Sequence, residues 1–114
     1  MADAESDLLR SSCDLLILKA LSWGPMHGYA VSEWIETATT EVLLVEEGTL
    51  YPALHRLERR GWISSEWGIS ANNRRAKFYR LTPQGRAHFR QQSPLWHRHA
   101  EAIALALRCE TAKP

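Results

Sequence analysis

The segment from residue 48 to residue 61 has two unlike faces when it is read as a helix. Leu50, Leu54 and Leu57 lie at positions i, i+4 and i+7, so their side chains share one apolar stripe. Hydroxyl, aromatic, imidazole and guanidinium groups occupy most of the other positions. Gly61 stands where a left-handed residue commonly ends a helix. The pattern predicts a short helix whose apolar back packs on a core and whose polar front is free.

Proline and glycine positions indicate where this helix begins. Pro52 has no N–H group, and a helix tolerates proline best in its first turn, where that N–H group would have no partner. We therefore expect Gly48 and Thr49 to form the cap of the helix.

Other helices and a hairpin are predicted on either side of this segment. The Gly-Pro pair at 24–25 ends a first helix, and the Asn-Asn pair at 72–73 suits a turn because asparagine tolerates positive φ. Thr82 before Pro83 is typical of a helix start. In chain order, the predicted elements are a helix over 12–21, a helix over 26–37, an edge strand over 42–45, the helix over 48–61, strands over 62–67 and 76–81, and a last helix from 83.

This order of elements is that of a winged helix-turn-helix. We expect a mainly α-helical fold with a small β-hairpin. The third helix would enter a DNA major groove, and the hairpin, or wing, would lie on the backbone or the minor groove. The predicted divisions are a flexible N-terminal tail over 1–11, a winged helix-turn-helix domain over 12–82 and a C-terminal dimerisation helix over 83–110.

The last helix carries a heptad pattern that predicts a homodimer. The residues that fit this short coiled-coil seam are Phe89, Trp96, Ala100, Ile103 and Leu107. The alternative is that these side chains pack back on their own domain. Pro94 lies inside the expected helix, and we expect it to kink or split the helix because it removes one i→i−4 hydrogen bond.

Charge is distributed unevenly, although the 114 residues carry a net charge of only +1. Residues 1–55 hold 2 basic and 9 acidic residues, residues 56–90 hold 9 and 2, and residues 91–114 hold 3 and 2. A basic segment in an otherwise acidic chain suggests a surface for a polyanion such as nucleic acid. Charges that are separate in sequence can still intermix in space.

Several classes of protein are disfavoured by what the sequence does not contain. No apolar run approaches the roughly 18 residues of a membrane span, and the acidic N-terminus lacks a signal-peptide core, so we expect a cytoplasmic protein with no membrane partner. Cys13 and Cys109 match no zinc or redox spacing, and we expect two reduced thiols, with a bridge between them as the lesser alternative. No cofactor or metal is expected, and no catalytic motif argues for an enzyme.

Four motifs resemble the PadR family of bacterial transcriptional regulators over about residues 13–90. They are Leu15-Leu-Ile-Leu18, Gly24-Pro-Met-His-Gly-Tyr29, Glu47-Gly-Thr-Leu-Tyr-Pro-Ala-Leu-His-Arg-Leu-Glu58, and Arg75-Ala-Lys-Phe-Tyr-Arg-Leu-Thr82 with Pro83 and Gly85. The resemblance implies a dimeric DNA-binding regulator, usually a repressor and often released by a small molecule. The short segment after the wing resembles the subgroup with a single dimerisation helix.

Nine residues are candidates for contact with double-stranded operator DNA, which we expect to be palindromic. They are His27, Thr49, Tyr51, Pro52, His55, Arg56, Arg74, Arg75 and Lys77. Tyr51 could instead pack in the core, and Arg56 could contact a base or a phosphate. The function class left open beside the regulator is a winged-helix adaptor that binds another protein without sequence-specific DNA binding.

Leu95 and Trp96 are candidates for binding a small hydrophobic or aromatic effector. Both are large for a solvent-facing side of a helix. At a two-fold interface, paired Trp96 side chains could stack on a flat aromatic molecule. The alternative is that Trp96 is an ordinary core residue.

Overall fold

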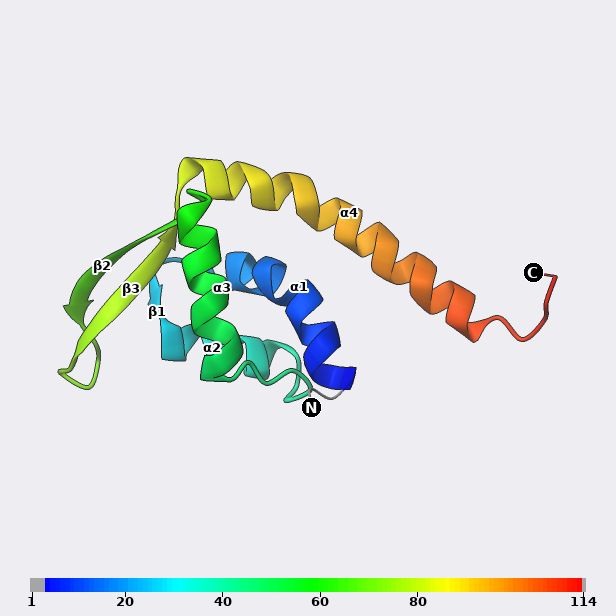
Figure 1. The fold of residues 1–114 in the computed structure, drawn as a ribbon, viewed down its shortest axis with the longest axis horizontal. Coiled ribbons are helices and arrows are strands. Elements are labelled where there is room, and N and C mark those ends of the chain that lie inside the picture. Colours follow the sequence, from blue (N-terminus) through cyan, green and yellow to red (C-terminus); the bar gives the residue numbers. More distant parts are fainter. Residues whose placement is uncertain (1–3, 114) are drawn as a thin grey trace.

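The computed structural model of this protein describes residues 4–113. The described part consists of α1 (Ala4–Leu21), β1 (Met26–His27), α2 (Gly28–Ala38), α3 (Glu47–Arg59), β2 (Ile63–Ile69), β3 (Arg75–Leu81) and α4 (Pro83–Arg108). Figure 1 shows α1, α2 and α3 beside a small sheet, with α4 crossing above them and projecting past the domain. The molecule is elongated, with extents of 58 × 31 × 24 Å. This architecture confirms the predicted winged helix-turn-helix with a long last helix.

The core lies between the first three helices, and the sheet closes one side of it. Leu50, Leu54 and Leu57 of α3 are at most 1% exposed, which confirms the predicted apolar stripe. Ile17 of α1 and Ile35 of α2 are fully buried in the same cluster. Because the back of α3 is committed to this core, its polar front faces outward.

The sheet has three antiparallel strands in the order β1-β3-β2. Ile63 pairs with Leu81 at the domain end of the hairpin, and Ile69 pairs with Arg75 near its tip. The predicted hairpin is confirmed, and β2 extends two residues further toward the tip than the expected end at residue 67. Asn73 adopts a φ of 57° in the turn, as the sequence indicated.

The expected edge strand over 42–45 was wrong. The third strand of the sheet is instead β1, where Met26 pairs with Tyr79. The 42–45 run is tied to α2, because Ser32 Oγ donates to the Val45 carbonyl at 3.0 Å and the Leu43 N–H donates to Thr39 Oγ1 at 3.1 Å. These bonds hold the run as a loop that lowers Val45 into the core, where it is 6% exposed.

The first helix begins earlier than expected. The flexible tail predicted over 1–11 is helical from Ala4 onward, and residues 1–3 lie outside the described part. The reason is that the apolar stripe of α1 continues one turn before Ser12. Leu9 lies four residues before Cys13 and is 8% exposed, so it belongs to the buried cluster.

The start of α3 also differs from the prediction. Glu46, and not Gly48 or Thr49, is the N-cap residue, and its side chain makes no capping hydrogen bond. Pro52 therefore lies past the first turn, inside the helix. We infer that burial of the leucine stripe outweighs the one hydrogen bond that Pro52 cannot make.

The end of α3 agrees with the sequence. Gly61 has a φ of 76°. Its N–H donates to the Glu58 carbonyl at 3.0 Å, and the Trp62 N–H donates to the Leu57 carbonyl at 3.1 Å. These two bonds form a Schellman motif, which ends the helix and directs the chain into β2.

The last helix is joined tightly to the domain. Thr82 Oγ1 accepts the Gly85 N–H at 3.0 Å, which confirms the predicted cap before Pro83. A Cβ atom at Gly85 would stand 1.8 Å from the Trp62 carbonyl oxygen, so only glycine allows this close approach. Of the kink or split expected at Pro94, the split does not occur, since α4 is one helix from Pro83 to Arg108 that bends gently along its length (Figure 1). Arg90, whose carbonyl would have bonded the missing N–H, is exposed, so water can reach that carbonyl.

Candidate nucleic-acid interface

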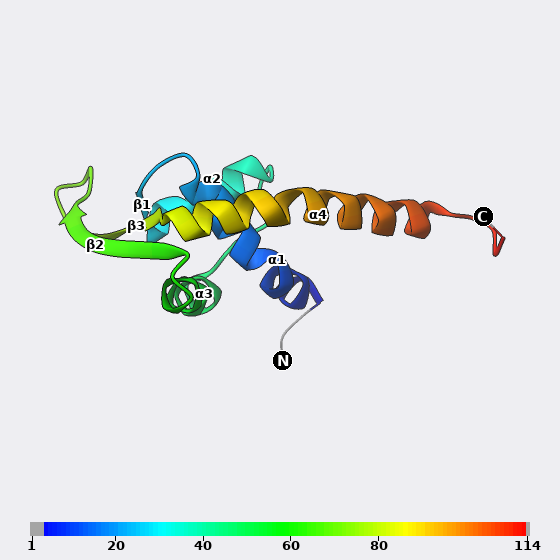
Figure 2. The ribbon, with the colours of Figure 1, turned by 90° about the horizontal axis from the view of Figure 1, so that it is seen from above.

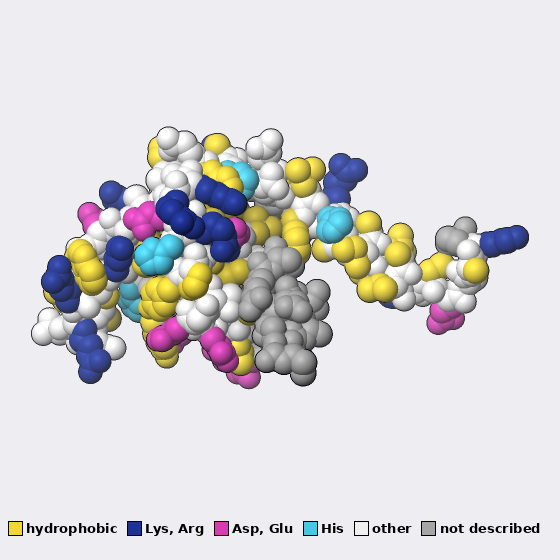
Figure 3. Space-filling view, in the orientation of Figure 1, with side chains coloured by type: hydrophobic (Ala, Val, Ile, Leu, Met, Phe, Trp, Pro, Cys, Tyr) yellow, Lys and Arg dark blue, Asp and Glu magenta, His cyan; other side chains and the backbone are white. Residues whose placement is uncertain are grey.

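The outward face of α3 is the centre of the candidate interface. Tyr51, Pro52, His55 and Arg59 are all exposed and recur at helical spacing opposite the buried leucines. Figure 3 shows Lys, Arg and His side chains gathered over α3 and over the hairpin on the same face of the molecule. Three of the predicted contact residues thus share one face, and Arg59 joins them.

Tyr51 stands over the start of α2 and is not a core residue. It is 39% exposed, and a Cβ atom added at Gly28 would lie 3.0 Å from its hydroxyl oxygen. A side chain at position 28 would therefore require the Tyr51 ring to shift by a few tenths of an ångström. The tyrosine hydroxyl is placed beside the first turn of α2, where helix N–H groups favour an anion such as a phosphate.

His27 has a structural role at the same place. Its Nδ1 accepts the Ala30 N–H at 3.2 Å, so the imidazole caps α2. The ring also packs edge-on against Phe78, with 5.6 Å between the ring centroids. His27 lies near the candidate interface, but the hydrogen bond to Ala30 leaves only Nε2 for another partner.

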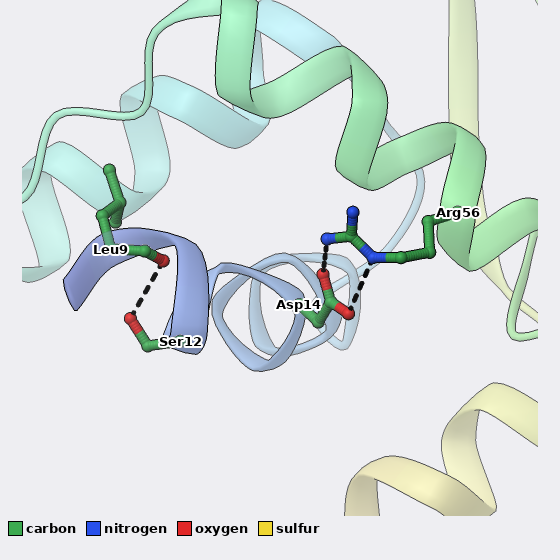
Figure 4. A network of polar contacts seen from close by, with 4 residues as sticks. All are labelled: Leu9, Ser12, Asp14 and Arg56. Atoms are coloured by element: carbon green, nitrogen blue, oxygen red, sulfur yellow. Dashed lines mark hydrogen bonds and ion pairs between the residues drawn. The ribbon is translucent and has the colours of Figure 1, made fainter. Parts of the chain in front are cut away.

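Thr49 and Arg56 lie on a different flank of α3, turned toward α1. Arg56 forms a bidentate ion pair with Asp14 of α1, with Nη2 2.5 Å from Oδ1 and Nε 3.3 Å from Oδ2 (Figure 4). The hydrogen bonds that Arg56 donates to the Asp14 carboxylate raise the pKa of Arg56 above its ordinary value. Part of the hydrogen-bonding capacity of Arg56 is therefore used inside the chain, which the sequence did not indicate.

The wing divides its charged residues between two faces. Ser65 Oγ donates to Glu58 Oε2 of α3 at 2.6 Å, so the face of β2 that carries Ser65 is turned toward α3. Trp67 and Ile69 lie on that same face, because side chains alternate along a strand. Lys77 and Arg75 are opposite them in the strand register, so these two cations also lie on the face turned toward α3. Arg80 lies on the opposite face, where its Nη1 is 4.0 Å from Glu66 Oε1.

Arg74 is exposed in the turn, so the three predicted wing cations lie at the tip and on the α3-facing side. Trp67 accompanies them and was missed by the sequence reasoning. It is 59% exposed and lies under the Arg75 guanidinium, with 4.5 Å between the guanidinium carbon and the ring centroid. Strand alternation together with the hairpin register could have placed Trp67 beside these cations.

The seam residues on α4 differ in their surroundings. Phe89 is partly buried and packs against the core of its own domain. Trp96, Ile103 and Leu107 are 39%, 46% and 81% exposed, and Ala100 is also exposed. Within the described residues no other element covers the part of the helix over 100–108 (Figure 2).

Two hollows lie where α4 crosses α1, and Trp96 borders both. One has a volume of about 540 Å³ and is lined by Leu95, Trp62 and His88 among others. Trp62 and His88 stack there at 3.6 Å between ring centroids. The other, about 430 Å³, lies between Phe89, Leu16 and Trp96. Of the candidate effector residues, Leu95 therefore lines the first hollow and Trp96 lines both.

The remaining chemistry of the described residues is limited. Cys13 and Cys109 are free thiols, and burial raises the pKa of Cys13 to about 11. The described residues hold no group of three His, Cys, Asp or Glu side chains that could bind a metal ion. Among the described helices, none is long and apolar enough to cross a membrane.

The helix α3 has a buried back and a polar front, a capped helix precedes it, and a basic wing lies beside it. Together these elements define a DNA-binding regulator of the winged-helix class. The chain belongs to the transcriptional regulator PadR-like family, whose family model matches residues 17–91. Its single long helix after the wing agrees with the short subgroup. The family consists of transcriptional regulators and not of enzymes.

Related proteins agree with this assignment. A transcriptional regulator from Clostridium thermocellum is 35% identical and has a TM-score of 0.76 over 87% of this chain and 96% of that one. Transcriptional regulator Rv3488 of Mycobacterium tuberculosis is 51% identical over 61 residues, which are 54% of this chain and 43% of that protein. Bacillus subtilis PadR, solved in complex with operator DNA, shares the fold at a TM-score of 0.62 and 22% identity, over 70% of this chain and 45% of that one.

Proposed function

We propose that the protein is a homodimeric repressor that binds a palindromic operator through α3 and the wing. The observation that carries the proposal is that the exposed front of α3 and the unpaired cations of the wing lie on one face. In a two-fold dimer, two such faces would enter successive major grooves about 34 Å apart. Bacillus subtilis PadR, which shares this fold, was solved in complex with operator DNA, and this supports DNA as the partner.

Within one protomer we assign different tasks to the candidate residues. Tyr51, Pro52 and His55 meet base edges from the first half of α3, where recognition helices contact bases. Arg74, Arg75 and Lys77 contact phosphates and the minor groove, and they set affinity more than sequence preference. Thr49 and Arg56, on the flank of α3 turned toward α1, contact the sugar-phosphate backbone of the DNA at the border of the site.

The dimer forms through the exposed half of α4, and the candidate effector binds beside it. Ile103 and Leu107 present an apolar seam that a second copy can cover. A small hydrophobic or aromatic molecule would bind the hollows next to Trp96. The effector would release DNA only if it binds more tightly to the protomer arrangement that does not fit the operator.

The first test is selection of bound duplexes from a random library, followed by sequencing and by affinity measurement over a range of salt concentrations. An enriched palindrome with half-sites one helical turn apart is the expected result. DNA binding without any enriched motif would contradict sequence-specific repression. No binding at all would favour the protein-interaction adaptor.

A matched pair of variants tests the orientation on DNA. Lys77→Ala should weaken binding to all duplexes and reduce the salt slope by about one per protomer, because one phosphate contact is lost. Arg98→Ala removes the same charge from the exposed part of α4 and should leave affinity nearly unchanged. Equal effects of the two variants would show that the wing does not face the duplex.

The effector proposal is tested by titrating a planar aromatic dye while tryptophan emission and DNA affinity are recorded. Quenching and weaker DNA binding are expected for the unmodified protein, and Trp96→Leu should abolish both. Trp23→Leu is the control, since Trp23 is 66% exposed and borders neither hollow. Quenching that persists in Trp96→Leu would place the dye elsewhere.

A further inference from the structure

The outer half of the hairpin carries large apolar side chains that its own domain does not cover. Trp67 is 59% exposed and Ile69 is 64% exposed, although both lie on the face that buries Ile63 and Tyr79 nearer the domain. The side chains continue the apolar side of the strand past the edge of the core. Exposed aromatic side chains of this size, beside cations, commonly indicate a binding surface.

The cations of this face are arranged around Trp67. Arg75 stacks on the indole, with its guanidinium carbon 4.5 Å from the ring centroid, and Lys77 is the cross-strand partner of Trp67. Among the described residues, neither cation forms an ion pair with a carboxylate. Arg80, on the other face of β3, faces Glu66. The unpaired positive charge of the strand pair is therefore concentrated on the side that carries Trp67.

Stacking changes what Arg75 can do. An arginine on an exposed strand samples many rotamers, and binding has to fix one of them. The indole under the guanidinium holds the side chain in place by a cation–π contact and leaves the N–H edge of the fork free. That edge can then donate two hydrogen bonds to a phosphate or to the acceptors of a minor groove.

We propose that Trp67 and Arg75 act as one DNA-binding unit of the wing. The indole positions the Arg75 guanidinium and itself contacts the deoxyribose edge of the bound duplex. This inference rests on the proposed DNA-binding function, and it adds an apolar residue to a contact that sequence reasoning attributed to charge alone. Trp67 is a positioning residue for Arg75 and also a part of the contact surface.

The test measures the affinity of the full-length protein for the duplex enriched by random selection, at several salt concentrations. If selection enriches no sequence, a mixed-sequence duplex at low salt is the probe. Trp67→Leu and Arg75→Lys should each weaken binding about threefold per wing, and so about tenfold for a dimer, with the salt slope unchanged because no charge is lost. Arg75→Ala should weaken binding further and lower the slope by about one per protomer.

Non-additivity distinguishes a coupled unit from two separate contacts. The Trp67→Leu/Arg75→Lys double variant should have nearly the same affinity as whichever single variant binds DNA less tightly, whereas the effects of independent contacts would multiply. Trp67→Phe, which keeps an aromatic ring under the guanidinium, should recover most of the affinity. Arg80→Ala, on the opposite face of the same strand, should change affinity less than twofold.

Thermal unfolding of each variant separates a loss of contact from a loss of structure. Unchanged unfolding midpoints with weakened binding support the unit. Normal binding by Trp67→Leu, additive effects in the double variant, or a loss of affinity that only follows a loss of stability would each overturn it. Absence of DNA binding by the unmodified protein would overturn the proposed function as well, and is recognised before any variant is made.

Discussion

The domain over residues 4–82 and the second half of α4 use similar apolar side chains in opposite ways. In the domain, Leu54 and Ile35 are at most 1% exposed, and each helix turns its apolar stripe toward the others. In the second half of α4, Leu105 and Leu107 are 67% and 81% exposed. Figures 1 and 2 agree that this part of the helix leaves the domain without touching it.

This difference teaches that one hydrophobic pattern has two uses in a small chain. Apolar residues that meet other elements of the same chain stabilise the fold, whereas those that extend past the domain are available to a second copy. The first turns of α4 belong to the domain, because Gly85 meets the Trp62 carbonyl and Phe89 packs on the core, so the border between the two regions lies after Phe89. Substitutions in the domain should therefore change the folding equilibrium, whereas substitutions in the second half of α4 should change self-association.

The largest effect is expected from Gly85→Ala, which acts where α4 is joined to the domain. Its Cβ atom would overlap the Trp62 carbonyl oxygen, so α4 or the chain at Trp62 has to move. We expect a loss of about 4 kcal/mol or more in the free energy of unfolding, measured by denaturant titration. Gly48→Ala is the control, since a Cβ there meets nothing within 4 Å and alanine favours a helix. Equal stability of the two variants would contradict the tight joint.

A second pair of variants compares the two regions directly. Leu54→Ala should lower the free energy of unfolding by about 3 kcal/mol at any protein concentration, because it leaves a cavity in the core. Leu107→Ala should leave the fold intact and raise the dimer dissociation constant, measured by sedimentation equilibrium. If Leu107→Ala leaves self-association unchanged, the seam on α4 is not where a second copy binds.

The pH dependence of stability probes the buried region. Burial raises the pKa of Cys13 from 9.0 to about 11, so the folded state keeps the thiol proton that the unfolded chain loses. The free energy of unfolding should fall by about 2 kcal/mol as the pH rises from 9 to 11. Cys13→Ala, compared under reducing conditions, should remove most of this decrease. A remainder is expected from Tyr79, whose pKa burial also raises.

The smallest effect on stability is expected from Asp14→Asn. The ion pair between Asp14 and Arg56 is about one-third exposed, so its loss should cost about 1 kcal/mol or less. The same change removes the carboxylate that competes with the DNA phosphate for Arg56, and it should increase the salt slope of DNA binding by at most about one per protomer. Glu66→Gln frees Arg80 on the opposite face of the wing and should not change that slope.

Periodic patterns predicted most of the fold. The leucine stripe of α3, the Thr82 cap and the hairpin all depend on local spacing, and the structure has each of them. The strand expected over 42–45 failed because this apolar run forms a loop in which Val45 is buried while Val42 and Leu44 stay 72% and 55% exposed. Its actual place depends on hydrogen bonds to α2 that no local pattern encodes. The prediction of a flexible tail over 1–11 failed because the apolar stripe of the first helix extends to Leu9, one turn before the expected start at Ser12.

The candidate site was predicted in outline from residue types. Tyr51, Pro52 and His55 share the exposed face of α3, as their spacing implies. The pairing of Arg56 with Asp14 joins residues 42 positions apart, so only the tertiary packing of α1 on α3 could reveal it. Trp67 was missed because its neighbours on the wing are set by the strand register and not by proximity in sequence.

The close fit at Gly85 makes the last helix a lever. The helix is clamped at one end by the Thr82 cap and the Trp62 carbonyl, and its 26 residues reach about 39 Å at 1.5 Å per residue. A rotation of about 5° at the clamped end would displace the far end by about 3 Å over that length. In a dimer joined by the far ends, a small tilt of the domain would therefore be amplified into a large change in the separation of the two α3 helices.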